Sequence, residues 1–235
     1  KHLNLKGLHC HIGSQIFESE PFVTAAKIMV SFLVEVRAKY GYVTKYLNLG
    51  GGFGVKYVEN DPEINYRKRI EEVSIKIKNI CEKENFPLPN ILMEPGRSLV
   101  ADAGMTLYTV NSVKEIKNYT NYVSIDGGMT DNPRYALYES KYTVYNATRA
   151  GDEPDYIATI AGRCCESGDL IQENVKIKKP IKGDIIAVAT TGAYNYSMAS
   201  NYNRVARPPV VMLSDDGDYL AVKRESLDDL IKLDI

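Results

Sequence analysis

The sequence predicts an α/β region followed by a β-rich region. Within the first hundred residues, strand-like and helix-like segments alternate, and three short polar motifs each follow a strand. From about residue 105 onwards, strand-like runs succeed one another without long helices between them. A chain of 235 residues is long enough for two modest domains. We therefore expect one domain over residues 1–104 and a second over residues 105–235.

Composition and charge place the chain among ordinary globular proteins. Hydrophobic residues make up 44% and charged residues 25%, and the formal net charge is -1. Lysine and arginine are scattered, so we expect neither nucleic acid nor a membrane surface as a partner. No apolar run approaches the roughly 20 residues that span a bilayer, which predicts a cytoplasmic protein. The four cysteines lack the spacing of a metal site and are expected to be free thiols.

The α/β region shows a strand, helix, strand, helix, strand order. Pro21 suits the first turn of the first helix, and Gly41 suits its end. Such alternation implies parallel strands, whose carboxyl ends gather ligands. Three strands cannot close a (β/α)8 barrel, which needs about 250 residues. The expected segments are 6–12, 21–40, 46–49, 61–84 and 91–93.

The β-rich region is expected to form an antiparallel β-sandwich or β-barrel domain. Glycine-containing turns separate its strand-like runs. Ser226, with Asp229 three residues later, resembles a capping box that opens a short final helix. The expected strands are 105–113, 122–125, 141–146, 156–161, 184–189, 210–213 and 219–223.

Two motifs in the α/β region suit an anionic cofactor. The run Gly50-Gly51-Gly52 follows a strand, where backbone amides can approach a phosphate, although a tight turn is an equally simple explanation. In Glu94-Pro95-Gly96-Arg97, an acid and a base stand at the end of a buried strand, where each needs a partner. One suits a cationic ring nitrogen and the other an anion; the alternative is a turn with a surface ion pair.

Histidine and cysteine supply two further candidates. His9 and His11 alternate along the first strand and would share a face, yet no third ligand stands at a supporting spacing, so we expect no metal. The flat imidazole of His11 could instead stack on a planar cofactor, with the Ser14 hydroxyl reaching its phosphate. Carboxylates close to Cys165 in sequence disfavour its thiolate, which suits a proton donor. The alternative is a half-buried structural cysteine.

Taken in order, these motifs resemble the alanine-racemase-like (fold type III) decarboxylases that use pyridoxal phosphate (PLP). Within that group the chain is most similar to the diaminopimelate decarboxylase family, because Glu166 follows Cys165 and Arg207-Pro208-Pro209 ends a segment that opens at Gly192. The motifs that carry the resemblance are 11–15, 50–52, 94–97, 126–128, 132–138, 165–169 and 192–194.

The resemblance implies a fold and a set of residue roles. The first domain would be the C-terminal part of a PLP-binding (β/α)8 barrel. His11 would stack on the PLP ring, Glu94 would pair with the pyridine nitrogen, and Cys165 would donate a proton to the substrate. The other cofactor-binding residues would be Ser14, Gly51, Gly52, Gly96, Arg97 and Tyr194. The substrate-binding residues would be Arg97, Arg134, Tyr138, Glu166 and Tyr194.

The implied reaction is decarboxylation of meso-2,6-diaminopimelate to L-lysine, the last step of lysine biosynthesis. In the family, Cys165 and Glu166 would complete the site of the other subunit of a head-to-tail homodimer. The family's Schiff-base lysine lies upstream of the histidine motif, and no lysine of this chain matches it. We therefore expect a C-terminal fragment that is inactive alone. The alternatives are another fold type III decarboxylase, of the polyamine or carboxynorspermidine type, and a non-catalytic fragment.

Overall fold

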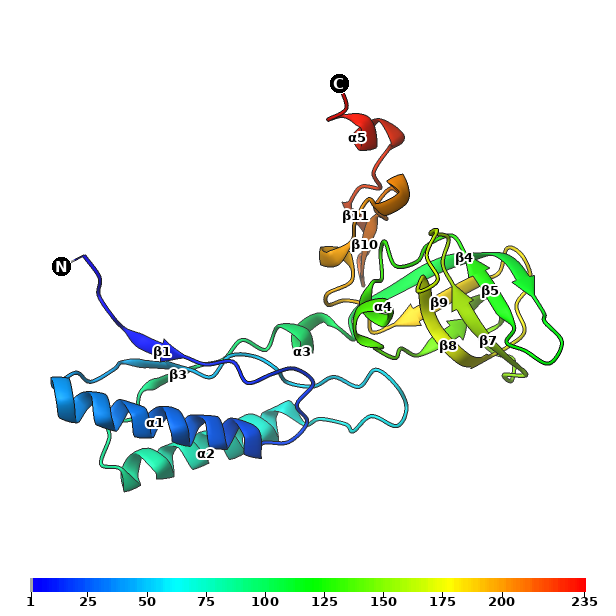
Figure 1. Cartoon of the computed structure of the whole chain (residues 1–235). Coiled ribbons are helices and arrows are strands. Elements are labelled where there is room, and N and C mark those ends of the chain that lie inside the picture. Colours follow the sequence, from blue (N-terminus) through cyan, green and yellow to red (C-terminus); the bar gives the residue numbers. More distant parts are fainter. Residues whose placement is uncertain (1) are drawn as a thin grey trace. The chain divides into compact units, whose positions relative to one another are not determined.

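The computed structural model describes residues 2–235 and divides them into two compact units (Figure 1). The first unit comprises residues 2–56 and Asn60–Val100; the second comprises Tyr57–Glu59 and Ala101–Ile235. In the described part of the chain, no helix is long and apolar enough to cross a membrane.

The first unit is an α/β layer. Strands β1 (Gly7–His9), β2 (Tyr46–Asn48) and β3 (Asn90–Leu92) form a parallel sheet in the order β1-β2-β3. Helix α1 (Glu20–Tyr40) connects β1 to β2, and helix α2 (Tyr66–Lys83) connects β2 to β3. Figure 1 shows the two helices side by side along one face of the sheet. This is the predicted α/β arrangement of three parallel strands with helical crossovers.

The ends of α1 confirm the sequence prediction, whereas the start of α2 corrects it. Pro21 lies in the first turn of α1, and Gly41, with φ 65°, donates its backbone N–H to the carbonyl of Arg37 at 2.8 Å. We expected the second helix to begin near Asp61, but it begins at Tyr66. The side chain of Asn65 accepts a hydrogen bond from the backbone N–H of Lys68 at 3.0 Å, and this cap fixes the start.

The core of the first unit lies between the sheet and the two helices. The rings of Phe22 on α1 and Phe53 after β2 stack with centroids 4.6 Å apart. Full burial of a leucine or phenylalanine side chain stabilises the fold by about 1.5–3 kcal/mol. The buried members of this core are Phe22, Ala26, Val30, Leu33, Leu47, Leu49, Phe53, Val73, Ile77, Cys81 and Phe86.

The second unit contains a six-stranded sheet in the order β6-β9-β4-β5-β7-β8. Its pairs are antiparallel except for β5 and β7, which run parallel. The predicted all-antiparallel domain is therefore wrong at this pair, because the connection through β6 returns the chain to the sheet in the direction of β5. The strands are β4 (Met105–Lys114), β5 (Tyr122–Ile125), β6 (Val144–Asn146), β7 (Tyr156–Ala161), β8 (Leu170–Ile177) and β9 (Ile185–Ala189).

Strand β4 bends and lets the sheet curl. Its first half pairs with β9 and its second half with β5, with a register shift between Val110 and Ser112. The outermost strands, β6 and β8, contact each other, and the backbone N–H of Tyr142 donates to Gln172 Oε1 at 3.0 Å. The buried side chains inside this curl include Val110, Val123, Ile125, Ile160, Ile171, Ile186 and Val188.

The remaining elements of the chain are short. Strands β10 (Val210–Ser214) and β11 (Gly217–Val222) pair as an antiparallel hairpin. Helix α5 (Leu227–Ile231) begins at the predicted capping box, in which the Ser226 hydroxyl accepts from the Asp229 N–H at 3.2 Å. Helices α3 (Gly96–Val100) in the first unit and α4 (Arg134–Tyr138) in the second were not predicted, because five residues are too few to show a helical period.

Candidate active site

The three motifs of the first unit follow the carboxyl ends of its three strands. Strand β1 ends at His9, β2 at Asn48 and β3 at Leu92. Because the strands are parallel, the residues that follow them lie at one edge of the sheet. These residues are His11, Gly50, Gly51, Gly52 and Glu94.

A backbone amide holds the ring of His11. The N–H of Gly51 donates to Nδ1 of His11 at 3.2 Å, so Nδ1 is the acceptor and the neutral ring carries its proton on Nε2. A Cβ at Gly51 would collide with the carbonyl oxygen of Glu94, so glycine is required for this close approach. Since β1 ends at His9, the expectation that His9 and His11 share a strand face is wrong.

The carboxylate of Glu94 is held by two neighbouring strands. Asn48 Nδ2 at the end of β2 donates to Glu94 Oε1 at 2.8 Å, and His9 Nε2 at the end of β1 lies 3.4 Å from the same oxygen. Asn48 Oδ1 in turn accepts from the N–H of Gly50 at 2.9 Å. The Glu94 side chain is 54% exposed, so its carboxylate is positioned and still open to a ligand.

Arg97 is buried and bonds to the loop after β1. Its Nη2 donates to Ser14 Oγ at 2.9 Å, and Arg97 is only 9% exposed. The alternative of a surface ion pair within the Glu94-to-Arg97 turn is therefore wrong. A guanidinium beside a hydroxyl forms a small group of hydrogen-bond donors suited to an anion.

These residues fit a phosphate-bearing planar cofactor. Side-chain donors (Ser14, Arg97), a positioned acid (Glu94) and an oriented flat ring (His11) all occur within the first unit. Gly51 offers a backbone without a side chain in the same place. Among residues 2–235, the histidines, cysteines and acids form no group of three or more that could hold a metal ion.

A second group of predicted residues lies around Arg134, at the start of α4. Its Cζ is 5.2 Å from the ring centroid of Tyr138 and 5.6 Å from that of Tyr194. Arg134 is 8% exposed, and its Nε has no hydrogen-bond partner in the part of the chain that the structure describes. The buried Tyr142 hydroxyl lies 3.4 Å from Asn195 Oδ1, and its burial raises the pKa of Tyr142 to about 12.

A third group contains Cys165 and Glu166, in the loop between β7 and β8. The N–H of Cys165 donates to Asn203 Oδ1 at 2.9 Å, and the Tyr202 hydroxyl donates to Glu166 Oε1 at 2.6 Å. This bond to the carboxylate raises the pKa of Tyr202. Cys165 is exposed, so the alternative of a half-buried structural cysteine describes its neighbour Cys164 instead.

Sequence reasoning missed several residues that hold these groups. The polar side chain of Asn48, at the last position of a strand and next to the buried Leu47, was a readable signal, because the carboxyl ends of parallel strands are where ligands gather. Tyr202 and Asn203 stand 36 and 38 residues from their partners. They lie within the segment that opens at Gly192 and contributes to the resemblance, but nothing near them in the sequence points to Cys165 or Glu166.

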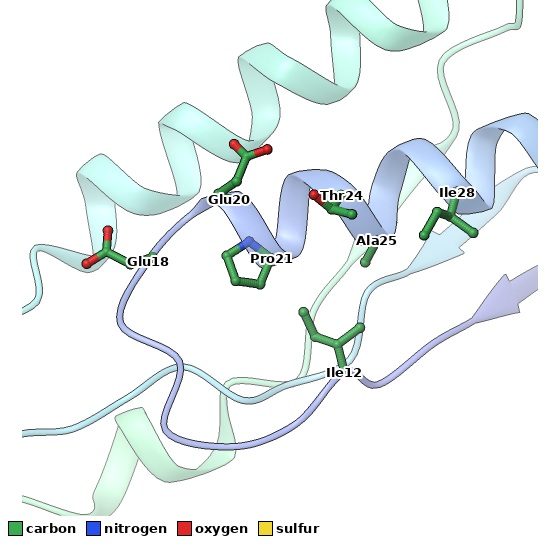
Figure 2. A pocket seen from close by; sticks show the side chains of 7 residues that line it. All are labelled: Ile12, Glu18, Glu20, Pro21, Thr24, Ala25 and Ile28. Atoms are coloured by element: carbon green, nitrogen blue, oxygen red, sulfur yellow. The ribbon is translucent and has the colours of Figure 1, made fainter.

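A separate groove of about 600 Å³ lies between the loop after β1 and helix α1 (Figure 2). Figure 2 shows Ile12 on the loop facing Pro21, Ala25 and Ile28 on the helix. Apart from Glu18, Glu20 and Thr24 its lining is apolar, and its charges are negative, so it does not suit a phosphate. It contains none of the predicted site residues.

Comparison with known proteins gives two results, one for a family model and one for a single relative. Residues 1–101 match the family model of the pyridoxal-dependent decarboxylases, pyridoxal binding domain. The chain is 48% identical over 235 residues to the diaminopimelate decarboxylase of Bacillus subtilis (strain 168), covering 100% of this chain and 54% of the relative. The chain is thus similar to the pyridoxal-dependent decarboxylases, to their pyridoxal binding domain over residues 1–101 and to a diaminopimelate decarboxylase along its whole length.

Solved structures show the same similarity. Diaminopimelate decarboxylase from M. jannaschii, in complex with L-lysine, has a TM-score of 0.91 and 36% identity, covering 100% of this chain and 53% of that one. The Helicobacter pylori enzyme complexed with L-lysine has a TM-score of 0.81 and 31% identity, over 97% of this chain and 54% of that one. The resemblance to the diaminopimelate decarboxylases is thus confirmed. The chain spans about half the length of the relatives it matches.

Proposed function

We propose that the full-length protein containing this chain uses PLP to decarboxylate meso-2,6-diaminopimelate to L-lysine. The observation that carries the proposal is the buried Arg134, which contacts the rings of Tyr138 and Tyr194 and whose Nε has no hydrogen-bond partner among the described residues. A buried guanidinium of this kind suits a carboxylate far from the reacting centre of the substrate. The L-lysine complexes of the M. jannaschii and Helicobacter pylori enzymes support the same substrate class.

The first unit would hold the cofactor. Bound PLP supplies an electron sink for the charge left when carbon dioxide departs from the α-carbon. Glu94, kept in place by Asn48, would keep the pyridine nitrogen protonated, and His11 would lie against the ring. Ser14 and Arg97 would bind the phosphate together with amides of the glycine run. The remaining proposed phosphate contacts are Gly51, Gly52, Gly96 and Tyr194.

The second unit would recognise the substrate and supply the proton. Arg134 and Tyr138 would bind the distal carboxylate, together with Arg97 and Tyr194, and Glu166 would bind the distal ammonium. Cys165 would donate the proton from Sγ to the α-carbon. The exposure of Cys165 supports this role, because a donor must reach the substrate.

The finer points of architecture are also proposals. We propose that β1 to β3 form part of a (β/α)8 barrel in the full-length protein, and that the curled six-stranded sheet is a β-barrel domain. We further propose a cytoplasmic head-to-tail homodimer in which Cys165 and Glu166 complete the site of the other subunit. The family match of residues 1–101 and the contact between β6 and β8 support the first two points.

A substrate comparison on the full-length protein tests the activity. We expect kcat/KM for meso-2,6-diaminopimelate to exceed that for ornithine and arginine by at least about 100-fold, because a buried arginine without its carboxylate partner is costly. Arg134→Lys should raise KM for this substrate about 10-fold or more, since an ammonium lacks the planar fork. Preference for ornithine, arginine or carboxynorspermidine would favour a polyamine-type decarboxylase instead.

A further inference from the structure

The motif Asp126-Gly127-Gly128 has no role in the proposed reaction, yet it packs against the loop that carries Cys165. Arg163 donates its backbone N–H to the carbonyl of Gly127 at 3.1 Å and its Nη1 to the carbonyl of Asp126 at 3.2 Å. The two loops, 126–131 and 162–169, follow the parallel strands β5 and β7 and therefore lie side by side.

A single carboxylate joins the two loops. Asp169 Oδ1 accepts the backbone N–H of Met129 at 2.6 Å, and Asp169 Oδ2 accepts that of Cys164 at 2.6 Å. The carbonyl of Asp169 accepts from Gly162 at 2.8 Å, and its N–H donates to Glu166 at 3.2 Å. Asp169 is 3% exposed, so these bonds to a charged group are shielded from water.

The neighbouring glycines make room for this carboxylate. A Cβ built on Gly162 would meet Asp169 carboxylate atoms before any others, and the same holds for Gly128. Gly162 has no positive φ, and the three atoms nearest to a Cβ built there all belong to the Asp169 carboxylate. Gly128 and Gly162 thus leave free the space that the Asp169 side chain occupies.

We propose that Asp169 is a positioning residue: its carboxylate ties loop 126–131 to loop 162–169 and thereby sets where Cys165 and Glu166 project. This inference rests on the proposed function, because the value of the positioning depends on Cys165 and Glu166 meeting the substrate. Asp169 fixes the backbone on both sides of Cys165: its carboxylate accepts the N–H of Cys164, and its own backbone N–H donates to the carbonyl of Glu166.

The test compares Asp169→Asn with Asp184→Asn in the full-length protein. Asparagine is nearly isosteric with aspartate, but its NH₂ group cannot accept a hydrogen bond. One of the two backbone N–H groups, of Met129 or Cys164, would therefore lose its acceptor. Asp184 is a matched control: it is 5% exposed in the same unit and bonds to Asn146, Arg149 and the N–H of Ile181. The first readout is iodoacetamide labelling of Cys165 relative to Cys10, a thiol in the first unit that serves as an internal reference.

We expect Asp169→Asn to change the Cys165-to-Cys10 labelling ratio about threefold or more, and to lower kcat/KM about 10- to 100-fold, as loss of a hydrogen bond to a charged group would. Asp184→Asn should leave the labelling ratio unchanged. An unchanged ratio in Asp169→Asn would overturn the proposal whatever the activity. If the ratio changes but the wild-type protein leaves diaminopimelate intact, the proposed function fails and the positioning stands.

Gly162→Ala provides a second variant that keeps the carboxylate but displaces it. It should reproduce the change in labelling, and it should cost less stability in an Asp169→Ala background than in the wild type, because the collision is then removed. If the two substitutions change stability additively and Cys165 labelling in Gly162→Ala is normal, the proposed positioning role of Asp169 is contradicted. This pair keeps the test decisive if Asp169→Asn does not fold.

Discussion

The two units hold their proposed functional residues in different ways. In the first unit, residues at the end of β2 and just after it position the functional side chains. The backbone N–H of Gly51 holds His11, and the side chain of Asn48 at the end of β2 holds Glu94. In the second unit, side chains of one loop bond to the backbone of another, as the Asn203 side chain does when it accepts the N–H of Cys165. The first arrangement follows from parallel strands ending at one edge, whereas the second depends on pairs of residues far apart in sequence.

This difference predicts which kinds of substitution each part of the proposed site tolerates. Where a backbone amide holds a side chain, as Gly51 holds His11, the site is sensitive to added bulk, because a side chain blocks the approach. A site built on loops is sensitive to the loss of the side chains that fix the loops. The predictions below test that contrast, beginning with the largest expected effect.

Cys165→Ala in the full-length protein should lower kcat by about 100-fold or more, the usual contribution of a proton donor, while PLP absorbance stays normal. Cys164→Ala is the matched control, since its side chain has no proposed role, and it should remain within about threefold of the wild type. The measurement is single-substrate kinetics with meso-2,6-diaminopimelate. Equal activity of both variants with the wild type would remove Cys165 from the mechanism.

Mixing subunits tests whether the two units meet across a dimer. If Cys165→Ala and His11→Ala subunits are co-expressed, half of the dimers are mixed and each mixed dimer has one intact site. We expect recovery of about a quarter of the wild-type activity from two inactive variants. No recovery despite formation of mixed dimers would place Cys165 and His11 in the same subunit's site.

Gly51→Ala should damage the first unit by added bulk, because its Cβ would meet the carbonyl oxygen of Glu94. Overpacking of this kind costs about 1–3 kcal/mol, and we expect PLP to bind about 10-fold or more weakly. Gly151→Ala is the control: nothing lies within 4 Å of a Cβ there, so it should behave as wild type. Thermal unfolding and PLP titration measure both effects, and normal PLP binding by Gly51→Ala would show that the glycine run is only a turn.

The smallest expected effect concerns Glu225, which follows β11 and bonds to Asn201 and Arg207 in the segment before β10. Its carboxylate accepts hydrogen bonds from Arg207 Nε at 2.7 Å and Asn201 Nδ2 at 2.6 Å, and these lower the pKa of Glu225 from 4.5 to about 2. A lowered folded-state pKa adds stability above 4.5 that is lost as the pH falls towards 2.

Hydrogen exchange of the β10 and β11 amides, corrected for intrinsic rates, should reveal this dependence. Wild-type protection should fall by roughly a few fold between pH 4.5 and pH 2, whereas Glu225→Gln should be less protected at neutral pH and show no step in that range. A step that persists in Glu225→Gln would assign the dependence to another carboxylate.

The parts of the fold that were predictable are those with local signals. Pro21 and Gly41 bracket α1, and Ser226 with Asp229 opens α5. Strand β8 was missed because Gln172, Glu173 and Asn174 interrupt its apolar pattern and Asn174 has φ 53°. The parallel pairing of β5 with β7 joins segments that are distant in sequence, so a local pattern does not predict it.

The site shows the same division. The motifs around His11, Glu94 and Cys165 were readable, because few other purposes place such residues after strands, and their proposed roles came from resemblance to a family. Apart from Asn48, the residues that position them were not readable. Tyr202 and Asp169 act through hydrogen bonds whose partners become neighbours only in the folded chain.

The short segment Tyr57–Glu59 lies in the second unit although both of its flanks lie in the first. The Tyr57 ring meets that of Tyr142 edge to face at 5.2 Å, and its carbonyl accepts the N–H and the hydroxyl of Thr143. The chain thus passes from one unit to the other three times. A polypeptide that begins at Ala101 would lack Tyr57–Glu59, which pack as part of the second unit. Expression of the second unit alone therefore requires that this tripeptide be grafted on, or that the surface it covers be redesigned.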